Sequence, residues 1–155
     1  MTFHILLSQI TTIFLGLNML TTLSFESEIK SFYYGGSKED VFIKETDNKT
    51  LLLKPYRTEG LSNLLVVTLK RKYYFQLAYD ATTPHTFVEV RHGLINHAQT
   101  KKVSNDHYEI WEGASSIQFV NKSANEVSVN GLKVLRREYL SKGVPIFLNG
   151  KRILN

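Results

Sequence analysis

The chain has 155 residues, of which 43% are hydrophobic and 21% are charged, a composition typical of a globular protein with one domain or two small modules. It contains no cysteine, which excludes disulfide frameworks, thiolate metal sites and cysteine nucleophiles. The formal net charge of +5 is compatible with nucleic acid or an anionic membrane surface, but it requires neither. Eight Tyr and nine Phe, together with many β-branched residues, favour strands.

Residues 1–20 leave two alternatives open. They contain apolar stretches, but no Lys or Arg precedes Lys30 and no small-residue cleavage pattern appears. Polar residues dilute the stretch, so a transmembrane helix of about 20 apolar residues is not expected. The segment is either a degenerate export signal or, from Thr11 to Phe25, already part of the folded β structure.

The next elements are short β-rich segments separated by turn residues. We expect a strand at residues 29–34 that ends at the breaker pair Gly35-Gly36. Segments 41–45 and 49–54 flank Asp47-Asn48, which predicts a hairpin.

The clearest element is a second hairpin at residues 63–79. Apolar and aromatic residues alternate with period two on both sides of the charged turn at residues 70–72. The first arm is apolar on both faces, which predicts a central strand. We expect Val67, Phe75 and Leu77 to be buried.

The second half of the chain is again β-rich. The predicted strands are residues 86–90, 107–111, 116–120, 126–129 and 146–148, with Asn149-Gly150 as a hairpin turn. Residues 132–141 are ambiguous between one short helix, suggested by the spacing of apolar residues, and a strand at 133–135 followed by a loop. The fold class predicted is all-β, with two small antiparallel sandwich- or barrel-like modules at 1–92 and 105–155, joined by a polar linker at 93–104.

No residue pattern points to catalysis, a cofactor or a metal. The glycines lack the strand–glycine–helix context of a phosphate site, and His92 and His97 lack the regular spacing of zinc ligands. The carboxylates of Glu39-Asp40 lie in a polar segment, so we expect them to be solvated at the surface. Asn121-Lys122-Ser123 matches a glycosylation sequon, to which we assign no role. We therefore expect the protein not to be an enzyme.

A basic and aromatic stretch at residues 70–75 offers an alternative function. Basic loops with aromatic side chains on small β-barrels bind single-stranded nucleic acid by charge and stacking. The aromatic residues alternate as strand residues do, however, so the favoured interpretation is an exposed turn beside core aromatics. No direct nucleic-acid binding is expected.

Several segments, in the same order, resemble the TraK family of conjugative type IV secretion systems. In the first half, IKSFYYG at 29–35, LLLKP at 51–55, SNLLVVT at 62–68 with YYFQL at 73–77, and TPHTFVEVR at 83–91 are similar to its strands. In the second half, IQFVNKS at 117–123 and EYLSKGVPIFL at 138–148 are similar to its C-terminal module. The more distant TrbG/CagX-type proteins share the first hairpin.

The resemblance implies a periplasmic, outer-membrane-associated β protein that assembles in homo-oligomeric rings. It also implies contacts with a TraV-like lipoprotein and a TraB-like inner-membrane-anchored protein, and it carries over no catalytic residue. Because about 50 residues is small for an independent core, we expect the C-terminal module to hold the lipoprotein. The apolar residues expected to take part are Trp111, Phe119, Ile146 and Phe147.

Overall fold

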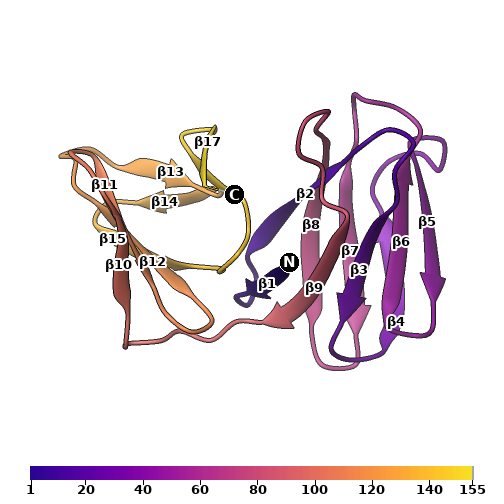
Figure 1. The fold of residues 1–155 in the computed structure, drawn as a ribbon, viewed down its shortest axis with the longest axis horizontal. Coiled ribbons are helices and arrows are strands. Elements are labelled where there is room, and N and C mark those ends of the chain that lie inside the picture. Colours follow the sequence, from indigo (N-terminus) through magenta and orange to yellow (C-terminus); the bar gives the residue numbers. More distant parts are fainter. Residues whose placement is uncertain (155) are drawn as a thin grey trace. The chain divides into compact units, whose positions relative to one another are not determined.

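The computed structural model describes residues 1–154, which form 17 strands and no helix (Figure 1). This confirms the all-β prediction. The chain divides into two compact units: Met1–Thr2 with Ile10–Arg91 form the first unit, and Phe3–Gln9 with the residues from His92 onward form the second. Because residues 1–154 contain no helix, none is present there with the length and apolarity needed to cross a bilayer.

The first unit consists of two sheets. One has the strand order β9-β3-β6-β5 and the other β2-β8-β7-β4. The strands are β2 (Ile10–Leu15), β3 (Thr21–Phe25), β4 (Ile29–Tyr34), β5 (Val41–Thr46), β6 (Thr50–Pro55), β7 (Asn63–Thr68), β8 (Lys72–Tyr79) and β9 (Phe87–His92).

Aromatic contacts join the inner faces of these two sheets. The ring of Phe25 on β3 lies 5.5 Å from the ring of Tyr73 and 6.2 Å from that of Phe75, both on β8. Aliphatic side chains surround them, completing the core of a sandwich. Those that are at most 1% exposed are Ile13, Leu15, Leu23, Leu51, Leu53, Leu64, Val66, Leu77, Val88 and Val90.

The hairpin at residues 63–79 is confirmed, and β7 is an interior strand between β8 and β4. Phe75 and Leu77 are buried as predicted, but the prediction for Val67 was wrong because this side chain is only half-buried. The register pairs Leu64 with Phe75 and Val66 with Tyr73, so the opposite face of β7 meets the core. With apolar residues on both faces, the alternation in β7 alone could not identify the buried one.

The N-terminal segment contains strands, in agreement with the second of its two alternatives. β2 pairs in parallel with β8, and β3 pairs in parallel with β9. The first unit is therefore mixed, with two parallel pairings among its antiparallel ones. Parallel partners lie far apart in the sequence, so local alternation carries no information about them.

The second unit consists of two four-stranded antiparallel sheets, with the orders β10-β11-β12-β15 and β14-β13-β16-β17. Residues 3–9 belong to it through reciprocal backbone hydrogen bonds between His4 and Lys142, at 2.8 and 2.9 Å. The strands are β10 (Thr100–Ser104), β11 (Tyr108–Glu112), β12 (Ile117–Asn121), β13 (Val127–Val129), β14 (Leu132–Val134), β15 (Arg137–Leu140), β16 (Ile146–Leu148) and β17 (Lys151–Leu154); β1 (Thr2–Ile5) begins in the first unit and continues into the second.

The structure refines two predictions for the second half. The segment 93–104 is not only a linker, because its last residues form β10; this edge strand is almost entirely exposed and so lacks apolar alternation. Of the two alternatives for residues 132–141, the structure has the strand, as β14, and not the helix; β15 then takes the place of the expected loop. Asn130-Gly131, with φ of 49° and 81°, forms the turn of the β13–β14 hairpin, so the residues after it continue as a strand.

Candidate interaction surfaces

Trp111 lies half-buried on β11, on one face of the sheet β10-β11-β12-β15. Its indole Nε1 donates a hydrogen bond of 2.9 Å to the carboxylate of Glu109, and the ammonium of Lys101 lies 5.4 Å from the ring centroid. The register places Lys101, Trp111, Gln118 and Tyr139 in one row across the four strands. This face therefore combines aromatic rings with a charge of each sign, a mixture suited to recognising a protein surface.

The other three residues expected to bind a partner lie in different environments. Phe119 and Ile146 are fully buried, and the Phe119 ring stacks on Tyr108 at 5.4 Å between ring centroids. Phe147 is half-buried on β16. Phe119 and Ile146 thus serve the core of the second unit, whereas Trp111 and Phe147 keep part of their surface exposed.

Asn121 links several segments of the second unit, a role that the sequon match did not suggest. Its Nδ2 donates to the carbonyls of Asn125, Val134 and Leu135 at 2.8, 3.2 and 3.0 Å. Its Oδ1 accepts hydrogen bonds from the amide and hydroxyl of Ser123. It lines two cavities of about 420 and 300 Å³, but its own hydrogen-bonding groups are all used within the chain, so its role is structural.

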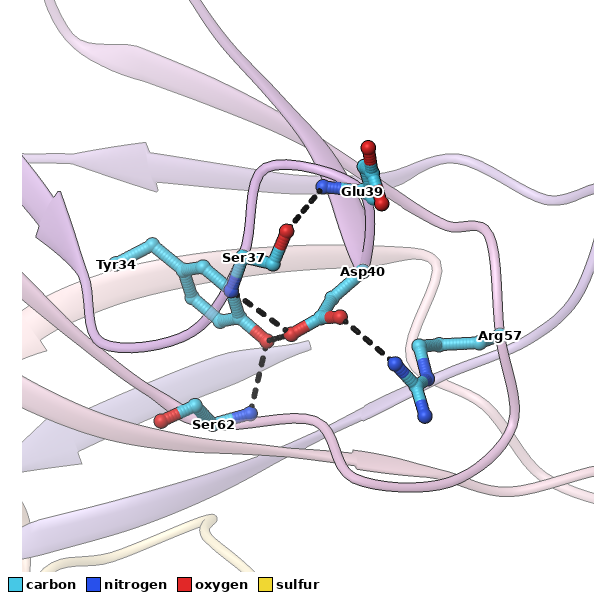
Figure 2. Close-up of polar contacts among 6 residues, drawn as sticks. All are labelled: Tyr34, Ser37, Glu39, Asp40, Arg57 and Ser62. Carbon is cyan, nitrogen blue, oxygen red and sulfur yellow. Dashed lines mark hydrogen bonds and ion pairs between the residues drawn. The ribbon is translucent and has the colours of Figure 1, made fainter.

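Asp40 is a buried carboxylate of the first unit whose side chain bonds to three other residues (Figure 2). Its Oδ2 accepts hydrogen bonds from the Tyr34 hydroxyl at 2.9 Å and the Ser37 amide at 3.2 Å. Its Oδ1 lies 3.1 Å from Nη1 of Arg57, and the Tyr34 hydroxyl in turn accepts the amide of Ser62 at 2.9 Å. Asp40 is only 4% exposed, so the expectation that it is solvated at the surface was wrong.

These bonds shift the acid–base properties of both partners. The hydrogen bond from Tyr34, helped by Ser37 and Arg57, holds the pKa of Asp40 below its ordinary value. Burial raises the pKa of Tyr34. Gly36 is required at this place, since a Cβ there would lie 2.5 Å from Oδ2 of Asp40. The cluster acts as a clasp that fixes the loop between β4 and β5.

The basic and aromatic stretch is largely part of the core. Tyr73 and Phe75 are 4% and 0% exposed, and burial raises the pKa of the Tyr73 hydroxyl. Tyr74, 40% exposed, is the aromatic residue of this stretch that offers a surface to stack on a base. Lys70 and Lys72 are exposed, whereas Arg71 is half-buried and its backbone bonds to Thr68.

The histidines form no metal-binding group with acidic residues in the part of the chain that the structure describes. Among residues 1–154, no three His, Asp or Glu side chains come close enough to hold a metal ion. His85 is buried, and its Nδ1 accepts the amide of Phe14 at 2.9 Å, so its role is to join two segments of the first unit.

No match is found for this chain among models of known protein families or among curated proteins.

Proposed function

We propose that the chain is a non-enzymatic structural component of a type IV secretion or conjugation apparatus, similar to the TraK family. It works in the periplasm, associated with the outer membrane, and forms homo-oligomeric rings. Its partners are a TraV-like lipoprotein and a TraB-like protein anchored in the inner membrane. The proposal rests on the ordered set of TraK-like motifs, and the surface of the second unit supports it.

The observation that carries the proposal is the Trp111 face beside an open strand edge. β10 is the outermost strand of its sheet, and most of its side chains are exposed. A strand from another protein can add to such an edge by backbone hydrogen bonds, while neighbouring side chains give specificity. Trp111 lies on the adjacent strand, and large aromatic side chains often dominate the binding energy of an interface.

The test is capture of a TraV-like lipoprotein, encoded near the same gene, by the full chain and by point variants. Truncation after Asn96 is unsuitable, because residues 3–9 pair with the second unit and would lose their partners. Trp111→Ala should weaken capture about tenfold or more, as expected for loss of an interface anchor. Phe87→Ala, which removes an aromatic side chain that is 48% exposed in the first unit, should leave capture unchanged. Equal capture by both variants would show that the Trp111 face is not part of the interface.

A further inference from the structure

A second surface, in the first unit, lies between two open strand edges. β4 pairs only with β7, and β5 pairs only with β6, so each is the outermost strand of its sheet. A groove of about 310 Å³ lies beside them. Its lining is almost wholly aromatic and aliphatic and consists of Phe32, Tyr34, Lys38, Val41, Phe42, Ile43 and Tyr56.

At the groove, edge-strand residues that pair with buried core residues are partly exposed. Phe32 pairs with Val66, and Ile43 pairs with Leu53, and both of these partners are fully buried. Phe32 and Ile43 themselves are only half-buried, because no further strand covers them. Proteins ordinarily protect such apolar edges, so this one is suited to receive a strand.

The Asp40 clasp makes the groove rigid before any ligand arrives. Tyr34 forms part of the groove wall, and its hydroxyl is held between Asp40 and the amide of Ser62 (Figure 2). The amide of Tyr56, another lining residue, donates to the carbonyl of Asp40 at 2.9 Å. A preformed wall lowers the entropy cost of binding.

The charge of the groove identifies the chemistry of its ligand. Lys38 is the one charged residue in the lining, and it forms no ion pair with any residue among 1–154. The nearby carboxylate of Asp40 is already bound by Arg57 and Tyr34, so it is not available to Lys38. An unpaired ammonium beside an apolar groove favours a carboxylate on the ligand.

We propose that this groove binds an extended segment of a partner protein, with alternating apolar side chains and one Asp or Glu, as an added strand. The apolar side chains would pack on Phe32 and Ile43, and the carboxylate would pair with Lys38. This site is separate from the Trp111 face, and it does not depend on the partner proposed there.

The test is selection from a phage-displayed library of random peptides of about twelve residues, with counter-selection against an Ile43→Lys variant of the full chain. A lysine at this position blocks strand addition, as charged residues do at natural sheet edges. Selected peptides should alternate apolar residues and carry an Asp or Glu. Absence of any enrichment over the Ile43→Lys variant would overturn the proposal.

Charge reversal gives the sharper measurement. Lys38→Glu should weaken binding of a selected acidic peptide about tenfold, and replacing its Asp or Glu with Lys should restore binding to this variant. Lys133→Glu, an equivalent change at an exposed lysine of the second unit, should have no effect. The proposal would be overturned if the wild type and Lys38→Glu each bound the acidic and the basic peptide equally well. Light scattering that shows a dimer lost in Ile43→Lys would also overturn it, by assigning the groove to a second copy.

Discussion

In the first unit, large apolar side chains fill the space between two sheets, whereas the second unit depends more on amide side chains that bond to the backbone. The first has Phe25, Tyr73 and Phe75 in mutual contact at its centre. In the second, side-chain oxygens of asparagines accept backbone amides at the turns and loops, at Asn96, Asn105, Asn121, Asn130 and Asn149.

The difference follows from strand length. Strands of the first unit run for five to eight residues, enough for alternation to build a continuous inner face. Strands β13, β14 and β16 have only three residues each, so turns make up more of the second unit. Turn backbone groups lack ladder partners, and asparagine side chains satisfy them. The comparison therefore predicts that the stability of the first unit falls most when a buried side chain is made smaller. The stability of the second unit should fall most when an asparagine side-chain amide is removed.

The largest effect is expected from Phe75→Ala in the core of the first unit. Removing a fully buried aromatic ring leaves a cavity and should lower the free energy of unfolding by about 3–5 kcal/mol. Denaturant titration followed by fluorescence measures the loss. Phe87→Ala, at a ring that is 48% exposed, is the matched control and should cost less than about 1 kcal/mol. A loss below about 1 kcal/mol for Phe75→Ala would show that the apolar core is not the main source of stability in the first unit.

Asn121→Ala should have the next largest effect, and it should act on the second unit. The substitution leaves three backbone carbonyls without their side-chain donor, for an expected loss of about 2 kcal/mol. Asn125→Ala is the control, since only the backbone carbonyl of Asn125 takes part in this cluster. Amide hydrogen exchange should show faster opening of β13 and β14 in the Asn121 variant alone. Unchanged exchange there would contradict the account of the second unit.

Asp40→Asn tests the Asp40 clasp of the first unit. Because the folded-state pKa of Asp40 is lowered, its ionised form stabilises the fold above the unfolded pKa of about 4. That contribution is lost as the pH falls through the folded-state pKa. The melting temperature of Asp40→Asn should thus be lower at neutral pH and approach that of the wild type in acid. Glu39→Gln, at an exposed carboxylate next to Asp40, is the matched control and should keep the melting temperature of the wild type at neutral pH.

The smallest effect is expected when Lys70, Arg71 and Lys72 are all replaced with alanine. Thr68 bonds to the backbone of Arg71, which the substitution retains, so each change should alter stability by less than about 0.5 kcal/mol. Fluorescence anisotropy with labelled oligonucleotides in physiological salt should show no specific binding by either protein. Micromolar binding by the wild type that the variant loses would favour the nucleic-acid alternative.

The sequence predicted the features whose causes are local. Asp47-Asn48 and Asn149-Gly150 form hairpin turns with positive φ at both residues, as their chemistry requires. The roles of Asp40 and Asn121 could not be predicted, because their partners Arg57 and Val134 lie 17 and 13 residues away. The Trp111 side chain was identified as a candidate, but its contact with Lys101 depends on the pairing of β10, an exposed strand without an apolar pattern.

The central claim is that the second unit holds the partner through β10 and the Trp111 face, while the first unit supplies a stable core. Amide hydrogen exchange of the full chain, with and without the TraV-like lipoprotein, tests it most directly. The account predicts slower exchange in residues 100–112 on binding and no change in the hairpin at 63–79. Slower exchange confined to 63–79, or no change in either segment, would contradict it.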